Sequence, residues 1–558
     1  MSLDVLFIHP PSVYDFRKKT LFTGPIARTV PLLTPVYICI PIGFISMGEY
    51  LFRHGYKIKI SNIAERMLNM KFNVEDFISK IEADIFGIDL HWCVHSHGAI
   101  EVAKICKKYH PNSLIVLGGL TATKFYSEIL EQYPFIDMVI RGEAEEPILS
   151  LINTYNQKNF SKIPNLSYRK NGKIKINEIK KPCNNLDNYN FTKLDLIEIK
   201  EKMLYFGKTK FWHIPVCRGC IYNCLTCGGS NYSYQKYFQR DKPAFRSPNK
   251  IVEDINYLIE QHIKSVFLFQ DIRMGGKKYV KSVINDLKNE KLDIENITLE
   301  LFYPASKNFL EDLKSIPAQL IYLTISPESG NNNVRKVQGR EYSTLELLKF
   351  INNFKSIKDE RFILNNFFMI GLKGQNKDTI NETWKLWDSI LGINKNSIEG
   401  TIHKPIVLTE FDVMTYLDPG SIAFDFSEKY GYKLFFKNFS DYQKGMLNPS
   451  WKYWFSYETN QLNRSNLANI ALNSWEMIIK LYKKHHLITD EQMTIELKKI
   501  KVNRIIIKEL DKILQIKNSK RQELKIQILK NAIDDNKILN FSWTLKNKFI
   551  DIYEKFKK

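Results

Sequence analysis

The stretch 217-CRGCIYNCLTC-227 places four cysteines within eleven residues, although the whole chain of 558 residues contains only eight. Three explanations compete for this crowding: a disulfide knot, a zinc site, and the seat of an iron–sulfur cluster. No secretory pattern precedes the first strand-like run, so we expect a cytoplasmic protein in a reducing compartment. Thiols in such a compartment serve as ligands or packing groups, which argues against disulfide bonds.

The spacing of the cysteines separates the two metal explanations. Cys217/Cys220 and Cys224/Cys227 each have the spacing of a zinc knuckle, but only three residues separate the two pairs. Zinc ribbons separate their pairs by about 15–20 residues, and the bacterial ferredoxin run orders its gaps differently. What remains is Cys220-x3-Cys224-x2-Cys227, a compact loop whose three thiolates can hold three irons of a 4Fe-4S cluster. The fourth iron then stays open to a substrate or cofactor, as in catalytic metal sites.

The composition describes a large soluble protein with a basic surface. Hydrophobic residues make up 44% and charged residues 25% of the chain, so several cores and more than one domain are expected. The formal net charge of +21 could attract nucleic acid, anionic lipid or acidic substrates. Because the lysines are spread along the chain and no nucleic-acid motif is recognisable, we expect no nucleic-acid partner. The most apolar stretch, 34–52, is interrupted by Pro41 and Glu49 and does not read as a membrane span.

Alternating strand-like and helical patterns predict two α/β domains. We divide the chain into a Rossmann-like (flavodoxin-like) domain over 1–155, a hairpin across Asn171-Gly172 with a linker over 156–204, a second α/β domain over 205–430, and a mainly helical region over 431–558. Ligands of a doubly wound sheet bind beyond the carboxyl ends of its strands. The predicted strands are 4–10, 57–63, 84–90, 114–119 and 137–142 in the first domain and 210–216, 265–271, 296–304, 320–326 and 363–371 in the second.

At the cysteine loop the sequence resembles a known family. The three-cysteine motif, preceded by Arg218-Gly219 and followed by Gly228-Gly229-Ser230, is similar to the cluster loop of radical S-adenosylmethionine (SAM) enzymes. The first domain, with 117-LGGLTAT-123 and 141-RGEAEEP-147, resembles the cobalamin-binding (vitamin B12-binding) domain fused to one large, class B-like branch of that superfamily. The resemblance covers about 1–430 and implies a partial (β/α) TIM-type barrel over 205–430. Within the branch, the pattern resembles an uncharacterised, largely archaeal group.

The resemblance implies the chemistry and the cluster ligands. In the family, the open iron of a 4Fe-4S cluster chelates SAM, and an electron from the cluster cleaves SAM to a 5′-deoxyadenosyl radical. Cys220, Cys224 and Cys227 match the three ligand positions. Since a fourth ligand would close the site, we expect Cys217 to be a buried neighbour. An auxiliary cluster in the C-terminal region is not expected, because no cysteine follows Cys227.

The SAM contacts match the family less closely. The glycine-rich turn that holds the methionine amino group would fall at 271–276, but the usual Gly-Gly-Glu is not there. For each lone carboxylate, a surface or ion-paired role is the alternative. The candidates are Asp271 and Gly275 in this turn, Glu300, Ser326 and Glu328 near the ends of later strands, and Gly371 after the strand that would contact adenine.

Cobalamin is expected in the first domain, although the histidine motif of many corrinoid domains is incomplete. Asp89-Leu90-His91 begins like Asp-x-His-x-x-Gly, but Val94 stands where the glycine belongs. Members of this branch often lack the histidine and still bind cobalamin, and the alternative is a domain that serves only as a scaffold. The candidate cobalamin contacts are Pro10, His91, Gly118, Gly119, Thr121, Thr123, Arg141 and Glu143.

The resemblance implies a radical SAM enzyme, and our leading hypothesis is a cobalamin-dependent methyltransferase that acts on an unactivated carbon. The alternatives are radical C–C coupling, cyclisation or rearrangement of an apolar substrate such as a lipid, and a non-enzymatic cluster- and corrinoid-binding sensor. The expected partners are a small-molecule or lipid substrate and an external one-electron reductant of the flavodoxin or ferredoxin type. The basic surface would also suit peripheral association with an anionic membrane. The segment 417–421 and the aromatic run 450–459 could line a substrate entry, but an aromatic-rich core is favoured.

Overall fold

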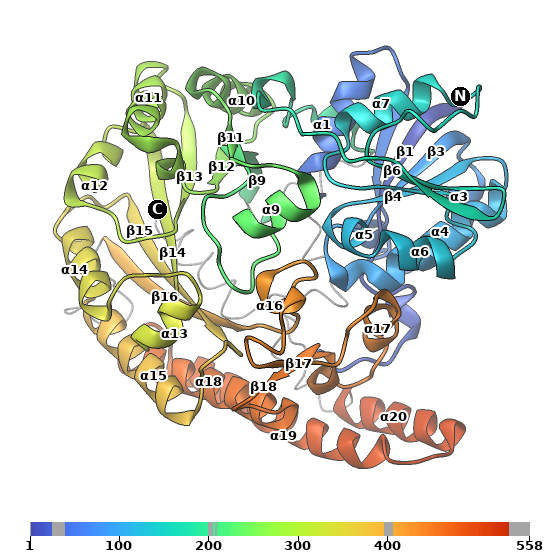
Figure 1. Cartoon of the computed structure of the whole chain (residues 1–558). Helices are drawn as coiled ribbons and strands as arrows, with labels where there is room; N and C mark the ends of the chain where they lie inside the picture. Colours follow the sequence, from blue (N-terminus) through green and yellow to red (C-terminus); the bar gives the residue numbers. More distant parts are fainter. Residues whose placement is uncertain (1, 25–39, 199–204, 207–208, 395–404, 535–558) are drawn as a thin grey trace.

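The computed structural model describes residues 2–24, 40–198, 205–206, 209–394 and 405–534. Two α/β units lie side by side, and the C-terminal segment runs below both of them (Figure 1). This is the predicted fold class: a Rossmann-like domain, a parallel sheet curved into a partial barrel, and a mainly helical C-terminal region.

The first sheet has the strand order β2-β1-β3-β4-β5-β6-β7. The first five strands pair in parallel, and their order 2-1-3-4-5 is that of flavodoxin-like folds. Each of the five predicted strands is confirmed, since apolar runs buried on both faces mark the strands of a parallel sheet. The strands are β1 (Leu3–His9), β2 (Ile58–Asn62), β3 (Ala83–Asp89), β4 (Leu114–Gly118) and β5 (Met138–Ile140).

Helices cover both faces of this sheet (Figure 1). The pattern over 123–133 predicts a single helix, whereas the structure has two helices that meet at Phe125, where the backbone leaves the helical conformation. The main helices are α1 (Ile42–Phe52), α3 (Val74–Ser79), α4 (Ser96–Tyr109), α5 (Leu120–Lys124), α6 (Tyr126–Gln132) and α7 (Glu145–Asn153).

The predicted hairpin is confirmed as β6 (Leu166–Lys170) and β7 (Lys173–Ile176). Asn171 and Gly172 join the strands with φ values of 51° and 71°. Positive φ at both central residues is the requirement of a type I′ turn, which Asn-Gly meets at low cost. The hairpin extends the first sheet through antiparallel pairing of β5 with β6.

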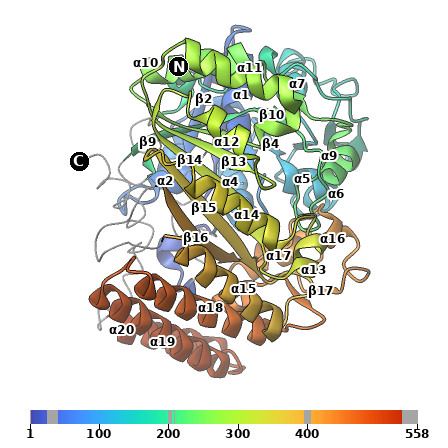
Figure 2. The ribbon, with the colours of Figure 1, turned by 90° about the vertical axis from the view of Figure 1, so that its left-hand side faces the viewer.

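The second sheet has the order β16-β15-β14-β13-β12-β9-β8, and all its pairs except β8 with β9 are parallel. Except for α9 (Asn231–Phe238), which lies on the inner side, its helices lie on the outer, convex side (Figures 1 and 2). A short pair, β10 (Cys217–Arg218) with β11 (Ala244–Phe245), follows the first parallel strand. The strands are β8 (Tyr205–Phe206), β9 (Thr209–Pro215), β12 (Ser265–Phe269), β13 (Ile294–Leu301), β14 (Ala318–Glu328), β15 (Phe362–Ile370) and β16 (Ile406–Val413), and the helices are α9 (Asn231–Phe238), α10 (Pro248–Glu260), α11 (Gly276–Asn289), α12 (Lys307–Leu313), α13 (Asn332–Val337), α14 (Thr344–Lys355) and α15 (Lys377–Gly392).

The C-terminal region contains one antiparallel pair of short strands, separated along the chain by a helix, and ends in three helices. The aromatic run forms a core, as favoured, because Trp451, Trp454, Phe455 and Tyr457 are fully buried. No helix in the described part of the chain combines the length and the hydrophobicity needed to cross a membrane. The elements are α16 (Ile422–Asp425), β17 (Tyr432–Leu434), α17 (Phe439–Gly445), β18 (Tyr457–Thr459), α18 (Arg464–Lys484), α19 (Asp490–Ile513) and α20 (Ser519–Asp534).

Candidate functional site

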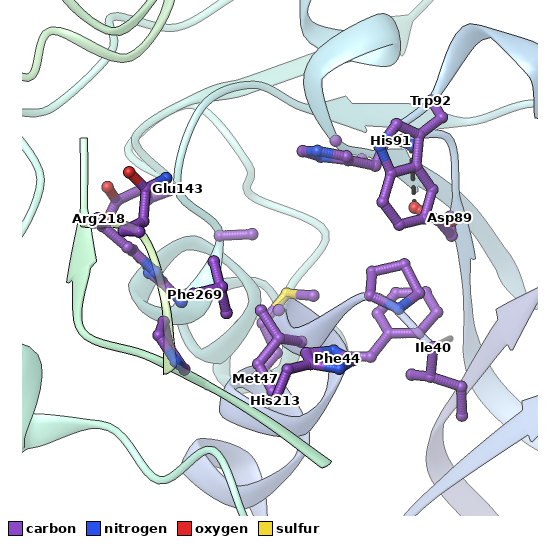
Figure 3. Close-up of a pocket in the computed structure, with 18 of the residues that line it drawn as sticks. Ile40, Phe44, Met47, Asp89, His91, Trp92, Glu143, His213, Arg218 and Phe269 are labelled. Carbon is purple, nitrogen blue, oxygen red and sulfur yellow. Dashed lines mark hydrogen bonds and ion pairs between the residues drawn. The ribbon is translucent and has the colours of Figure 1, made fainter. Parts of the chain in front are cut away.

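A cavity of about 980 Å³ lies between the carboxyl edge of the first sheet and the lumen of the barrel (Figure 3). The loops after β3, β4 and β5 and the start of α1 line it on one side, and inward-facing side chains of the barrel strands line it on the other. This is the edge at which doubly wound sheets bind their ligands. Representative lining residues are Met47, His91 and Gly118 from the first domain and His213, Phe269 and Glu300 from the barrel.

The cysteine loop follows β10 at the mouth of the barrel. Cys220 is buried, Cys224 is half-buried and Cys227 is exposed. The backbone N–H of Tyr222 donates to Sγ of Cys220 at 3.4 Å, and that of Gly229 donates to Sγ of Cys227 at 3.3 Å. Hydrogen bonds to cysteine sulfurs are among the features that set the potential of an iron–sulfur cluster.

Burial governs the charge of these thiols. It raises the pKa of Cys220 to about 11, and the protein packed around Cys227 raises the pKa of that thiol further although its side chain is accessible. The guanidinium of Arg340 opposes this effect and lowers the pKa of Cys220 and Cys224. Bound metal deprotonates thiol ligands outright, so high pKa values do not prevent ligation.

The spacing of the three cysteines fits a cluster, and the N–H···S bonds suit thiolate ligands. In the described ranges, no three His, Cys, Asp or Glu side chains lie close enough together to ligate one metal ion. Cys217 is buried, as predicted, and it lines the cavity next to the loop.

An ion-pair network ties this loop to the first domain. Arg218 donates to Oε2 of Glu143 at 3.2 Å and to Oε1 of Glu145 at 2.5 Å. Arg240 donates to Oε1 of Glu143 at 2.6 Å, and Ser46 donates to Oε1 of Glu145 at 2.6 Å. The Arg218 charge holds the pKa of Glu145 below its usual value although the carboxyl is buried. The motif 141-RGEAEEP-147 therefore orients the first domain against the cysteine loop.

The predicted cobalamin contacts divide into two groups. His91, Gly118, Gly119 and Glu143 line the cavity, whereas Pro10, Thr121, Thr123 and Arg141 are not among its lining residues. Pro10 is buried, and the other three hold neighbouring loops. Thr121 Oγ1 donates to the His91 carbonyl at 2.9 Å, Thr123 Oγ1 accepts from the Gly142 N–H at 3.0 Å, and Arg141 donates to the Asn177 carbonyl.

The two glycines after β4 differ in what they meet. Gly119 has φ of +107°, and a Cβ there would lie 2.5 Å from Cα of His91. A Cβ on Gly118 would meet nothing closer than the Ile140 carbonyl oxygen at 3.7 Å. Gly119 is therefore required by the neighbouring loop of the same domain, whereas Gly118 presents bare backbone to the cavity.

His91 faces the cavity from the end of β3, beside Asp89 and Trp92 (Figure 3). Its backbone N–H donates to Oδ1 of Asp89 at 2.9 Å, and Oδ2 of Asp89 pairs with Nδ1 of His9 at 3.0 Å. Burial lowers the pKa of His91, so its imidazole is neutral at pH 7. Neutral imidazole is the form that ligates metals, so this side of the cavity fits a corrin-bound metal.

Among the predicted SAM contacts, only Glu300 lines the cavity. Its Oε2 accepts the Gln270 N–H at 2.9 Å, and burial raises its pKa. Asp271 is committed to Arg273 Nη2 at 2.6 Å and to the Phe302 N–H at 2.8 Å. The Asp271 carboxylate therefore shapes the turn in which it lies.

The remaining candidates lie at the ends of β14 and β15 and near α11. Glu328 has φ of +67° at an irregularity of β14, and burial raises its pKa. Ser326 is half-buried and Gly275 precedes α11. A Cβ on Gly371 would lie 2.2 Å from Oη of Tyr457, and that hydroxyl donates to the Gly371 carbonyl at 2.9 Å. Packing against Tyr457 therefore accounts for the glycine.

Two functional candidates escaped the sequence analysis. Arg340 is buried beside the cysteines, with Nη2 3.6 Å from Oε1 of Glu328. It is the kind of buried cation that pairs with a carboxylate ligand. Asp418 accepts the N–H of Gly228, the residue after Cys227. Asp418 lies in the segment 417–421, which the sequence suggested as a substrate entry, but no local signal connected either residue with the cysteine loop.

Two family models match consecutive parts of the chain. Residues 28–152 match the B12 binding domain, and residues 214–386 match the radical SAM superfamily. The predictions of a 4Fe-4S cluster, SAM and cobalamin are therefore confirmed at the level of the two domains.

Curated relatives cover the same region. The chain is 26% identical over 398 residues to the anaerobic magnesium-protoporphyrin IX monomethyl ester cyclase of Rubrivivax gelatinosus, an alignment that covers 68% of this chain and 65% of that protein. The corresponding enzyme of Cereibacter sphaeroides is matched over 47% of its length, so the chain covers less than two thirds of either cyclase. An uncharacterized methyltransferase of Pyrococcus horikoshii is 24% identical, over 69% of this chain and 77% of that protein.

Solved structures share the fold at low sequence identity. The radical SAM methyltransferase TsrM of Kitasatospora setae, solved with cobalamin and a 4Fe-4S cluster, has a TM-score of 0.56 at 11% identity over 80% of this chain and 81% of that one. The cobalamin-dependent radical SAM enzyme OxsB, solved with aqua-cobalamin, has a TM-score of 0.58 at 13% identity over 100% of this chain and 79% of that one. Taken together, residues 28–152 form a B12-binding domain and residues 214–386 a radical SAM domain, which is the make-up of a radical SAM enzyme with a B12-binding domain in front.

Proposed function

We propose that the chain is a cobalamin-dependent radical SAM methyltransferase that acts on an unactivated carbon. The observation that carries this proposal is the shared cavity of about 980 Å³. One space is bounded by the ligand-binding edge of the B12-binding domain and by the barrel wall next to the cysteine loop. A methyl donor held by the first domain and a substrate held in the barrel would meet there.

When bound, the cluster supplies the electron that cleaves SAM to a 5′-deoxyadenosyl radical, and cobalamin supplies the methyl group. Cys220, Cys224 and Cys227 would hold the cluster. The N–H groups of Tyr222 and Gly229 stabilise negative charge on two of their sulfurs. Arg340 places a buried positive charge beside the cysteines, where it would offset the charge of the cluster and pair with a carboxylate.

The barrel wall serves to exclude water, and it offers little for acid–base catalysis. Phe211, Phe267 and Phe269 line the cavity along β9 and β12. Burial lowers the pKa of His213, between them, to about 4, so it is neutral at pH 7. A reactive intermediate needs an environment without water or solvent reductants, and these side chains provide an apolar wall.

The second candidate function is radical C–C coupling, cyclisation or rearrangement without methyl transfer. It is favoured by the cyclases among the relatives, one of them matched over 68% of this chain. The apolar character of the cavity suits such a substrate equally well. Retention of cobalamin decides between the two functions, because methyl transfer needs a methyl carrier.

We also propose an external one-electron donor of the flavodoxin or ferredoxin type. Such carriers are acidic, and the net charge of +21 suits them. The same charge would suit an anionic membrane surface, which liposome pelleting at low and high salt tests. Placement in a largely archaeal group rests on the sequence resemblance and stays a prediction.

The experiment is anaerobic purification of the chain from cells supplied with cobalamin, followed by incubation with SAM and reductant. We expect iron and sulfide near four per chain, stoichiometric cobalt, and release of 5′-deoxyadenosine. Alanine at position 220, 224 or 227 should abolish iron binding, whereas Cys217→Ala should retain it. Zinc in place of iron, or iron retained without these three cysteines, contradicts the proposal. Deoxyadenosine without bound cobalt favours the second candidate.

A further inference from the structure

The barrel wall of the cavity carries two carboxyl groups that form no ion pair in the described part of the chain. Glu300 on β13 and Glu410 on β16 both line the cavity. The other lining carboxylates are committed: Asp89 to His9, and Glu143 and Glu145 to arginines. Within the described ranges, no lysine or arginine pairs with either barrel glutamate.

The hydrogen-bond partners of the two barrel glutamates are neutral. Glu300 accepts the Gln270 N–H at 2.9 Å, and Oε2 of Glu410 accepts Nδ2–H of Asn365 at 3.0 Å. Burial raises the pKa of Glu300, and the charge of Arg340 partly opposes this effect. Arg218 also lines the cavity, but it is already engaged in two ion pairs. Glu410 is therefore the stronger candidate for a counter-charge on this wall.

Neutral polar side chains share this wall. Gln270 and Asn296 line the cavity, and Asn365, which is only 5% exposed, donates to Glu410 from the neighbouring strand β15. Their amides can hydrogen-bond to a ligand, but they bring no positive charge to the wall.

Aromatic faces complete this environment. Tyr322 on β14 and Phe267 and Phe269 on β12 line the same space. Aromatic faces attract cations, most strongly where water is excluded. The neutral His213 adds no positive charge that would repel one.

We propose that this wall binds a protonated amine of the substrate, with Glu410 as the counter-charge. The inference rests on the proposed function and narrows its substrate class to otherwise apolar molecules that carry an ammonium or a comparable donor group. A substrate carboxylate placed here would face the carboxyl of Glu410, which pairs with no lysine or arginine in the described ranges, so this part of the cavity disfavours anionic groups. The basic surface of the protein would attract anionic partners, whereas the wall around Glu410 would attract cationic groups.

The test uses the full chain, reconstituted anaerobically with its cluster and loaded with cobalamin and SAM. Isothermal titration compares three probes of similar size at pH 7.5: phenethylammonium, 2-phenylethanol and 3-phenylpropanoate. We expect phenethylammonium to bind at least tenfold more tightly than 3-phenylpropanoate. Glu410→Gln keeps the size of the side chain and should remove about tenfold of this preference, or about 1.4 kcal/mol. The matched control Glu290→Gln alters an exposed carboxylate and should leave the preference intact.

Equal binding of the charged probes by the wild-type protein, or tighter binding of 3-phenylpropanoate, overturns the inference. So does an undiminished preference in the Glu410→Gln protein. If that variant loses iron or unfolds at a lower temperature, Glu410→Asp replaces it: this variant keeps the charge and must keep the ammonium preference. Release of 5′-deoxyadenosine in the absence of a probe tests the proposed function by itself. A protein that cleaves SAM but shows no ammonium preference therefore contradicts only the amine-binding inference.

Discussion

The backbone N–H of Gly228 donates a hydrogen bond of 3.0 Å to Oδ2 of Asp418, a carboxyl that the protein buries after β16. Burial raises the pKa of Asp418. A Cβ on Gly228 would lie 2.7 Å from Cδ2 of Leu120 and 3.0 Å from Cβ of Asp418. The residue after Cys227 is therefore held between the B12-binding domain and the 417–421 segment. The end of the cysteine loop depends on both domains.

Removal of the Asp418 carboxyl should loosen the cysteine loop. We expect Asp418→Ala to leave the Gly228 N–H unpaired and a void beside Cys227, so that iron is lost to a chelator several-fold faster than from the wild-type protein. Asp418→Asn keeps an acceptor oxygen and should retain near-normal kinetics. The measurement is anaerobic iron release to a chromogenic ferrous chelator. Equal rates in all three proteins would show that the hydrogen bond does not stabilise the loop.

The glycine pair after β4 allows a matched test of cofactor contact and folding. Gly119→Ala puts a Cβ 2.5 Å from Cα of His91 at φ of +107°, so we expect a protein that is destabilised by several kcal/mol. Gly118→Ala meets no atom within 3.4 Å and should fold normally. Because Gly118 faces the cavity, this variant should bind cobalamin at least several-fold more weakly. Cobalt content and thermal unfolding of both variants check the prediction, and unchanged cobalamin binding by Gly118→Ala would remove Gly118 from the site.

The two sheets could be predicted from the sequence because their strands are short apolar runs between polar turns. The predicted strands 57–63 and 363–371 lie within one residue of β2 (Ile58–Asn62) and β15 (Phe362–Ile370) at every boundary. Strand β16 (Ile406–Val413) was missed, because 406-IVLTEFDV-413 carries Thr409, Glu410 and Asp412. Glu410 lines the cavity, so a charged residue stands where a core strand would carry an apolar one, and the apolar pattern that marks a strand is interrupted.

The candidate site was predictable only where its residues are local. Three cysteines within eight residues identify the cysteine loop, and the structure places them at the mouth of the barrel. Asp418 lies 190 residues from the Gly228 that it contacts, and no pattern in one sequence reports such a pair. Thr121 and Thr123 follow a glycine-rich turn, but their side chains hold neighbouring loops in place. Thr121 Oγ1 donates to the His91 carbonyl, and Thr123 Oγ1 accepts the Gly142 N–H.

The ion pairs of Arg218 should stabilise the arrangement of the two domains. Arg218→Met leaves Glu145 buried beside Ser46 without its counter-charge, while Glu143 keeps Arg240. Loss of one partner from a buried pair typically costs about 3–5 kcal/mol. We expect a lower unfolding midpoint and weaker cobalamin retention, because Glu143 lines the cavity.

Glu145→Gln provides the matched comparison for this network. This variant removes the charge that pairs with Arg218, and its amide oxygen can still accept the hydrogen bond from Ser46. Arg218 then retains Glu143, so we expect a smaller loss than in Arg218→Met. Differential scanning fluorimetry under anaerobic conditions measures both variants. Midpoints that match the wild-type protein would mean that the network contributes nothing to domain packing.

The buried His213 should make the stability of the protein depend on pH. Burial lowers its pKa to about 4, whereas the histidine of an unfolded chain keeps its ordinary pKa of 6.5. Between these two pKa values the unfolded state binds more protons than the folded state. His213 therefore has little effect on stability at pH 7, but it lowers the free energy of unfolding as the pH falls below 6.5. We expect His213→Phe to recover up to about 2 kcal/mol of the stability that the wild-type protein loses between pH 7 and pH 5. The measurement is urea unfolding of the protein without its cluster at both pH values, with the exposed His54→Phe as control. An equal loss in His213→Phe and the wild-type protein would show that His213 is protonated in the folded state, and the barrel wall would then carry a positive charge at pH 5.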